Sequence, residues 1–295
     1  MFHPIVIVIF HVHPPDRAVG HVATSHANLT GLLCQRIVYI RMLKVAFGHT
    51  GLSVSRLAIG TGTHGWDHAS DQTRKGRQWL VSTLKLGHSL GVNFWDLADQ
   101  YGSHDFARRA LKMLPRGEIV INTKTTASDY RSCWRDVKRF LTELGTEYLD
   151  IVLLHGVSAE NWWATHQGAV QALTEAKEQQ LVCAVGVSCH GFEALRFAAH
   201  EPWVDVLLVR LNSDGSNMDD RLDRVIPVVR NARAAGKAIY AMKVLAQGEL
   251  AADAAKAIQF VLDLDCVHAL VVGVTEISQL RQNVATVEQA EVNME

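Results

Sequence analysis

The sequence predicts an α/β fold, a (β/α)8 TIM barrel. From residue 57 onward, short apolar runs alternate with longer amphipathic stretches, and the runs start roughly 30 residues apart, the length of a strand plus a returning helix. Several runs are apolar on both faces, as expected for parallel strands covered by helices. The eight predicted strands are Leu57–Gly60, Asn93–Asp96, Ile119–Thr123, Ile151–Leu154, Cys183–Val187, Val204–Val209, Ala238–Ala241 and Ala269–Val272.

Amphipathic helices are predicted between these strands. In Ser132–Leu144 the apolar residues recur at steps of three and four, and Gly145 suits the end of that helix. A second helix is predicted over Met218–Ala235, with Pro227 either kinking it or marking a start within it. These helices complete the alternation that a barrel requires.

The main alternative fold is an open, doubly wound sheet. Such a sheet normally carries a glycine-rich G-x-G-x-x-G turn after its first strand. Gly60-Thr61-Gly62 begins this pattern, but Gly65 is followed by Trp66-Asp67 rather than by a helical run. The barrel is therefore the favoured fold.

Composition and charge exclude several classes of partner. The chain has 295 residues, 48% of them hydrophobic, a formal net charge of −1 and a pI near 6.9. This balance gives no reason to expect nucleic acid or an anionic membrane as a partner. No apolar stretch approaches the ~18–20 residues that span a bilayer. The five cysteines include no C-x-x-C pair, which favours reduced thiols and a cytoplasmic location. Oligomeric state is not readable from the sequence.

The first 41 residues differ from the rest of the chain. We predict a poorly ordered N-terminal extension over residues 1–41, before Met42, and the barrel domain over residues 42–295. A functional segment is the alternative, because His3, His11, His13 and His21 lie here and could bind a metal. The extension is the favoured interpretation, and no metal site is predicted.

Four polar residues stand at or just after the ends of successive predicted strands: Asp96, Tyr101, Lys124 and His155. A barrel brings the carboxyl ends of its strands to one rim, where chemistry takes place. A phenol, an ammonium, a carboxylate and an imidazole can together protonate a carbonyl oxygen. Lys124 against the phenol would lower the tyrosine pKa, with Asp96 pairing the lysine. Singly, each residue has an ordinary structural explanation such as a helix cap or a solvated side chain.

Several motifs resemble the aldo-keto reductase family. They are Gly48–Leu57, Asn93–Asp96 with Tyr101-Gly102, Leu144–His155, and Gly186-Val187-Ser188. The resemblance covers about residues 43–287. It implies a short hairpin before the first barrel strand and an enzyme that reduces an aldehyde or ketone with NADP or NAD, without a metal. It also implies that Tyr101 is the proton donor.

The resemblance further implies a set of cofactor-binding positions, several of which are altered here. Cys189 replaces a usual asparagine, Leu208 a glutamine and Met242 an aromatic residue. Lys243 stands at a small-residue position, where it could reach phosphates or be solvated. Thr275, Glu276 and Gln279 occupy positions that are basic in NADP-binding relatives, so the choice between NADP and NAD stays open. The predicted cofactor residues are Ser188, Cys189, Met242, Lys243, Leu245, Gly273, Thr275, Gln279 and Asn283.

Two tryptophans and two alternative functions complete the predictions. Trp66 and Trp162 are predicted to line the substrate pocket, although packing against helices is equally compatible. The favoured function is reduction of a small-molecule carbonyl substrate. One alternative is a cofactor-sensing or subunit-binding barrel with little turnover, and another is an unrelated barrel isomerase or lyase.

Overall fold

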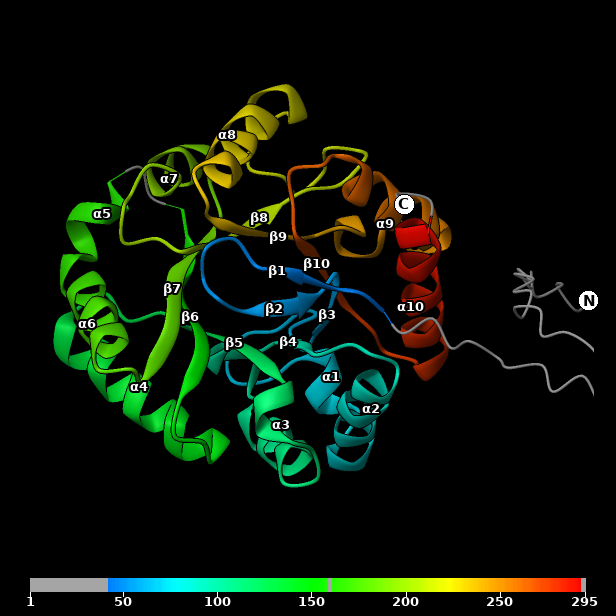
Figure 1. The fold of residues 1–295 in the computed structure, drawn as a ribbon, viewed down its shortest axis with the longest axis horizontal. Helices are drawn as coiled ribbons and strands as arrows, with labels where there is room; N and C mark the ends of the chain where they lie inside the picture. The colour runs from blue at the N-terminus through cyan, green and yellow to red at the C-terminus, as the bar shows by residue number, and fades with distance from the viewer. Residues whose placement is uncertain (1–41, 159–160, 293–295) are drawn as a thin grey trace, which may run out of the picture. The chain divides into compact units, whose positions relative to one another are not determined.

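The computed structural model describes residues 42–158 and 161–292. The predicted N-terminal extension and its histidines lie outside the described residues. Within the described part, the chain forms a barrel of strands surrounded by helices (Figure 1).

Eight parallel strands close the barrel in the order β10-β3-β4-β5-β6-β7-β8-β9, which confirms the predicted fold. All eight predicted strands are present, although β6 and β7 run further than expected, into Val157 and Cys189. The bounds are β3 Leu57–Gly60, β4 Phe94–Asp96, β5 Val120–Thr125, β6 Leu149–Val157, β7 Val182–Cys189, β8 Val206–Arg210, β9 Ala238–Met242 and β10 Ala269–Gly273.

Helices form the outer ring. The predicted helix that ends at Gly145 is α4, and Gly145 adopts the left-handed conformation (φ 65°) expected of such a terminator. The helix predicted from Met218 begins instead at Leu222 and contains Pro227 in its interior. The bounds are α1 Asp71–Arg74, α2 Arg77–Ser89, α3 His104–Leu111, α4 Tyr130–Leu144, α5 Trp162–Thr165, α6 Gln167–Glu178, α7 Phe192–Ala198, α8 Leu222–Ala234, α9 Ala254–Asp263 and α10 Ile277–Val292.

A hairpin of β1 (Lys44–Ala46) and β2 (Ser53–Ser55) covers the amino end of the barrel (Figure 1). Its Phe47 packs edge-on against Phe94 and Tyr240 inside the barrel. The amide of His49 donates to the carbonyl of Gly236, just before β9 starts. With the amino end covered, the carboxyl ends of the strands form the open rim.

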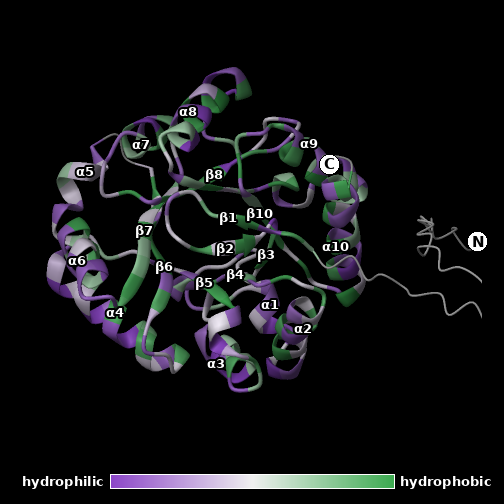
Figure 2. Ribbon diagram, viewed as in Figure 1, coloured by the Kyte–Doolittle hydropathy of each residue, from purple (hydrophilic) through white to green (hydrophobic). Residues whose placement is uncertain are grey.

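The hydrophobic core has two parts. One fills the space between strands and helices, and the other lies inside the barrel, where Phe94, Leu153, Leu208 and Tyr240 meet. Figure 2 shows apolar strands surrounded by helices with mixed surfaces, as expected for a parallel sheet covered by amphipathic helices. No helix in the described part of the chain is long and apolar enough to cross a membrane.

Candidate active site

A cavity of about 470 Å³ lies at the carboxyl ends of the strands. It gathers most of the residues that the sequence singled out, from loops far apart in the chain. Lys124, Ser188, Cys189 and Trp162 do not line it. The predicted residues that do are Asp96, Tyr101, His155, Trp66, Met242, Lys243, Leu245, Gly273, Thr275, Gln279 and Asn283.

Asp96, which lines this cavity, forms a buried ion pair with Lys124. Lys124 is fully buried and donates from Nζ to both carboxylate oxygens of Asp96, each at 2.8 Å, and to the Leu97 carbonyl at 2.8 Å. Asp96 also accepts from Asn122 (2.9 Å) and from the Tyr240 hydroxyl (2.8 Å). Since every N–H of the ammonium has an oxygen acceptor, the pair avoids the cost of an unpaired buried charge.

Lys124 therefore does not hydrogen-bond the Tyr101 hydroxyl as the sequence argument expected. Its three donors are already used, and its Nζ lies instead 4.8 Å from the centre of the Tyr101 ring. Burial and the nearby Asp96 carboxylate raise the pKa of Tyr101 above its usual value of 10. In this arrangement Tyr101 is a protonated phenol rather than a phenolate activated by Lys124.

Two glycines set the position of the Tyr101 ring. A Cβ added at Gly62 would lie 2.3 Å from the ring, and one added at Gly65 would lie 2.6 Å from it. Gly102, directly after Tyr101, has φ 64°, and a Cβ there would lie 1.9 Å from the carbonyl of His68. The glycines that suggested a nucleotide-binding turn thus make room for the tyrosine instead.

His155 lies beside Tyr101, at the carboxyl end of the barrel. Its Nε2 is 3.3 Å from the Tyr101 hydroxyl, and the two rings meet edge to face with centroids 5.4 Å apart. Burial, with the positive charge of Lys124 and the neighbouring His190, holds the pKa of His155 well below 6.5. His155 is therefore a neutral imidazole at physiological pH.

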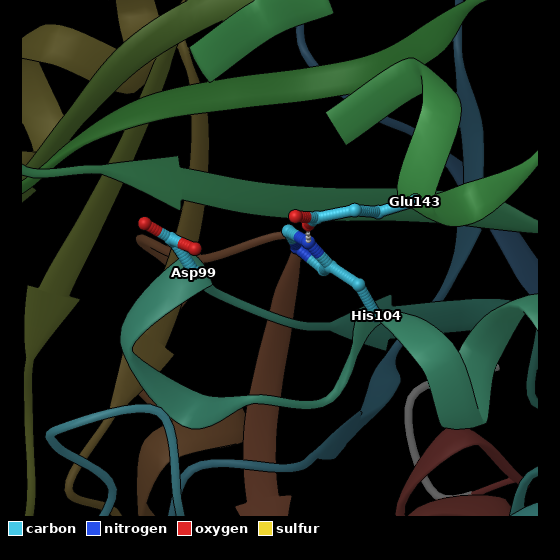
Figure 3. Close-up of side chains that lie close together, drawn as sticks. All are labelled: Asp99, His104 and Glu143. Carbon is cyan, nitrogen blue, oxygen red and sulfur yellow. Dashed lines mark hydrogen bonds and ion pairs between the residues drawn. The ribbon is translucent and has the colours of Figure 1, made fainter. Parts of the chain in front are cut away.

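The side chains of Asp99, His104 and Glu143 lie close together beside the 3-10 turn Asp99–Tyr101 (Figure 3). His104 bonds Glu143 (2.7 Å) through Nδ1 and Thr123 (2.8 Å) through Nε2. Both oxygens of Asp99 accept from Arg139, at 2.7 and 2.8 Å. Asp99, His104 and Glu143 are close enough to resemble a metal site, but the Arg139 guanidinium supplies the positive charge there. We interpret the cluster as a support for Tyr101 and, through Thr123, for Lys124.

The expected nicotinamide end of the site contains an unsatisfied polar group. Ser188 is buried, and no described residue hydrogen-bonds its Oγ. Across the β7–β8 ladder Ser188 pairs with Leu208, which lines the cavity together with Met242. Cys189 is fully buried and does not reach the cavity. Like Cys189, Ser188 does not line the cavity itself, but its Oγ is a buried polar atom without a partner among the described residues, and it lies next to the cavity residue Leu208.

The opposite end of the cavity is built by the loop after β10 and the start of α10. The side-chain oxygen of Gln279 accepts from the amides of Thr275 (2.8 Å) and Glu276 (3.1 Å). Glu276 forms an ion pair with Lys75 at 2.7 Å. A Cβ at Gly273 would lie 2.2 Å from Thr63 Oγ1, so only glycine fits there. The only cation in these contacts, Lys75, is thus already paired with a carboxylate.

The two predicted pocket tryptophans differ in placement. Trp66 is 55% exposed, lines the cavity and lies 5.9 Å from His155 between ring centroids. Trp162 is completely buried and packs edge-on against Phe197 and Trp203. The structure therefore corrects the placement of Trp162, because its indole is part of the helical layer and has no surface toward the cavity.

Sequence reasoning missed His190, which lines the cavity, and three residues that position groups of the site. Tyr240 and Asn122 both hydrogen-bond Asp96, and Arg210 contacts His190 beside the cavity. Asn122 could have been found, because it precedes Lys124 by two residues and so shares its face of the strand. Tyr240 and Arg210 come from distant strands, and only the closed barrel shows their partners.

The fold and the site define a class of protein, a (β/α)8 barrel whose rim carries a tyrosine, a histidine and a buried lysine–carboxylate pair. The model of the aldo/keto reductase family matches residues 56–256. The chain belongs to the aldo-keto reductase family.

Similar proteins agree with this assignment. The NADH-specific methylglyoxal reductase of Escherichia coli strain K12 is 27% identical over 174 residues, covering 50% of this chain and 52% of that protein. An aldo-keto reductase of Alternaria alternata is 25% identical over 231 residues, covering 64% of this chain and 58% of that protein. The chain thus spans little more than half the length of these relatives.

Solved structures resemble the whole barrel. A structure from Pseudomonas aeruginosa assigned to the aldo-keto reductases has a TM-score of 0.71 and 27% identity, covering 84% of this chain and 96% of that chain. An aldo-keto reductase from Bacillus halodurans has a TM-score of 0.69 at 20% identity, covering 84% and 91%. The second similarity shows the fold alone.

Proposed function

We propose that this protein reduces an aldehyde or ketone to an alcohol with a nicotinamide cofactor, and that Tyr101 gives the proton. One observation carries the proposal: the Tyr101 hydroxyl and His155 Nε2, 3.3 Å apart, line one cavity next to a buried Lys124–Asp96 pair. Two neutral hydrogen-bond groups at this spacing can both contact a single carbonyl oxygen.

The residues of the chain fit the cofactor. Ser188 offers a buried hydroxyl that no described residue satisfies, Met242 offers an apolar surface, and Gly273 lines the far end of the cavity. A bound reduced nicotinamide supplies a hydride to the carbonyl carbon. Ser188 would hydrogen-bond its amide, and Met242 would pack on its ring.

The proton step follows from the protonation states of the site. As the carbonyl oxygen becomes an alkoxide, Tyr101 donates its proton to it, because an alkoxide is a stronger base than a phenolate. His155 is neutral, and its tautomer with hydrogen on Nε2 would donate a second hydrogen bond to the same oxygen. The ammonium of Lys124, 4.8 Å from the ring centre, stabilises the phenolate that remains.

NADH is the cofactor that the far end of the cavity favours. Glu276 and the capping Gln279 stand where a 2′-phosphate would need cations, and the nearby Lys75 is already paired with Glu276. A carboxylate repels a phosphate but accepts hydrogen bonds from a ribose diol. The E. coli relative is named as NADH-specific, which supports the same preference.

The sensor or subunit-binding alternative is not favoured, because all four residues predicted to deliver the proton are present. Three of them, Asp96, Tyr101 and His155, line the cavity. A cytoplasmic location stays a prediction. It is supported by the four cysteines of the described residues, all of which are free thiols.

Steady-state kinetics on the purified full chain test the proposal. Wild type should oxidise NADH in the presence of benzaldehyde, with a lower KM for NADH than for NADPH. Tyr101→Phe should lower kcat by about 10²–10⁴-fold and leave NADH affinity, followed by tryptophan fluorescence, within about twofold. Tyr130→Phe, an exposed tyrosine on α4, is the control.

Two outcomes would contradict this function. Tight NADH binding without turnover of any aldehyde or ketone would favour the sensor alternative. Failure to bind either nicotinamide cofactor would remove the basis of the proposal.

A further inference from the structure

A second histidine lies next to His155 in the same cavity. His190 directly follows β7, and its ring centroid is 6.5 Å from that of His155, with the two planes nearly perpendicular. Its backbone amide donates to the carbonyl of Val157 at 2.7 Å, which ties the residue to the end of the neighbouring strand β6. Proton donation by Tyr101 and hydrogen bonding by His155 do not involve this imidazole.

Arg210, at the end of β8, determines which nitrogen of His190 carries hydrogen. One of its terminal nitrogens, Nη2, bonds His190 Nδ1. A guanidinium has only donors, so Nδ1 is the acceptor and the ring hydrogen lies on Nε2. Asp219, whose side chain is completely buried, forms an ion pair with Arg210 at 3.4 Å, with no hydrogen bond to either carboxylate oxygen among the described residues, so charge alone draws the guanidinium to it.

His190 is also held neutral. Burial, together with the positive charges of Arg210, Lys243 and Lys124, lowers its pKa to about 3. Within the described residues, no hydrogen bond to Nε2 is present. Because Nδ1 is tied to Arg210 and the ring lines the cavity, the Nε2–H edge is the one left to meet a ligand.

We propose that His190 is a specificity-determining residue that recognises a second oxygen on the substrate, carried by the carbon next to the reacting carbonyl. The substrate class is then vicinal: 2-oxoaldehydes and 2-oxo acids. Tyr101 and His155 would hold the reacting oxygen, and His190 its neighbour. This inference rests on the proposed carbonyl reduction and adds a substrate class to it.

The spacing of the two imidazoles suits this arrangement. Rings with centroids 6.5 Å apart can each place an N–H about 2.9 Å from one of two oxygens on adjacent carbons. Arg210 and Lys243 surround His190 with positive charge, which strengthens a hydrogen bond to an electron-rich oxygen. Lys243 lines the cavity and has no ion pair among the described residues, so the site accepts both a neutral carbonyl and a carboxylate.

Three substrates and two variants test the assignment. Benzaldehyde has one oxygen, whereas phenylglyoxal and phenylglyoxylate carry a second oxygen on the adjacent carbon. His190→Met removes the donor at similar side-chain length, and His190→Gln restores an N–H near the position of Nε2. For each substrate kcat/KM is measured with NADH, and the fold-loss relative to wild type is compared between substrates, which cancels their different intrinsic reactivities.

In His190→Met, the fold-loss for at least one of the two vicinal compounds should exceed that for benzaldehyde by about tenfold. His190→Gln should recover a large part of that difference. A greater loss for phenylglyoxylate identifies a carboxylate as the second group, and a greater loss for phenylglyoxal identifies a carbonyl. Melting temperatures and NADH affinities of both variants show whether the fold and the cofactor site are intact.

Equal fold-losses for all three substrates, or no loss for any, would overturn the inference while leaving carbonyl reduction in place. Failure of wild type to reduce any of the three compounds would instead remove the proposed function itself.

Discussion

The two halves of the site differ in how completely the chain satisfies the charged groups that it buries there. In the acid half, Asp96 accepts four hydrogen bonds and Lys124 donates three, although His155 Nδ1 and Asn122 Oδ1 have no partner among the described residues. In the cofactor half, Ser188 Oγ has no partner among the described residues and Lys243 has no ion pair there. The charged groups of the acid half find their partners when the chain folds, whereas Ser188 and Lys243 in the cofactor half remain available to a ligand.

This difference explains where each half tolerates change. In a buried ion pair whose charges are all hydrogen-bonded, altering one member leaves another without its partner, so the members are interdependent. Replacing a polar group that has no partner in the free protein costs little stability, and the lost hydrogen bond lowers affinity only when the ligand binds. Cys189 and Leu208, which replace usual family residues, both lie in the cofactor half.

Gly62→Ala should have the largest effect, because it breaks the acid half without touching any of its polar groups. The added Cβ would lie 2.3 Å from the Tyr101 ring, so the ring must move. A displacement of about 1 Å at a catalytic group can cost about 100-fold in rate. We expect kcat to fall by about that factor in NADH-coupled assays with benzaldehyde.

The matched control for this variant is Gly117→Ala, where an added Cβ meets nothing within 4 Å. It should retain the kcat of wild type. Normal activity of Gly62→Ala would show that the tyrosine ring is not fixed by this loop.

The sequence predicted the acid half by residue type and the barrel by its periodicity, but not the bonds within that half. Lys124 was expected against the Tyr101 hydroxyl, and it bonds Asp96 and the Leu97 carbonyl instead. Strand alternation could have indicated Asn122. Tyr240 looked like one more apolar residue of its strand, because its partner lies 144 positions away.

The placement of Trp162 and the His190–Arg210 contact show the same limit. Both depend on which strands and helices become neighbours, and on how a loop turns once the barrel has closed. Local sequence patterns specify elements and their faces, whereas contacts across the barrel are set by its closure and shear.

Ser188→Ala should have an intermediate effect, confined to the cofactor half. Its hydroxyl is buried and unpaired among the described residues, so the free energy of unfolding should stay the same or rise slightly. Loss of one hydrogen bond to the nicotinamide amide should weaken NADH binding by about fivefold to tenfold, measured by fluorescence titration.

Ser55→Ala provides the opposite case. Ser55 Oγ donates to the carbonyl of Leu57 at 2.7 Å and accepts from the amide of Asn93 at 3.1 Å, at the covered end of the barrel. Its removal should lower stability by about 1–2 kcal/mol and leave NADH affinity unchanged. If Ser188→Ala instead lost stability and kept its affinity, the distinction between the two halves would fail.

The smallest effect on kcat is expected from a change in pH. The acid half and the surroundings of His190 should respond to it differently. Between pH 6.5 and 9 neither His155 nor Tyr101 should change its protonation, because the pKa of His155 lies well below 6.5 and that of Tyr101 above 10. With benzaldehyde, kcat should vary by less than about twofold over this range. A plot of kcat against pH that shows an ionisation near pH 7 would contradict the directions of these two pKa shifts.

Near His190 the outcome should differ, because burial raises the pKa of Asp219 to about 6. The carboxylate that holds Arg210 is charged above this value and loses its charge as the pH falls through it. The preference for a vicinal substrate over benzaldehyde should therefore weaken below pH 6, where the guanidinium is no longer held against His190. Asp219→Asn should show the weakened preference at every pH, because it removes the titrating charge while keeping the side chain's shape. A preference that changes with pH in this variant as it does in wild type would place the titration elsewhere in the site.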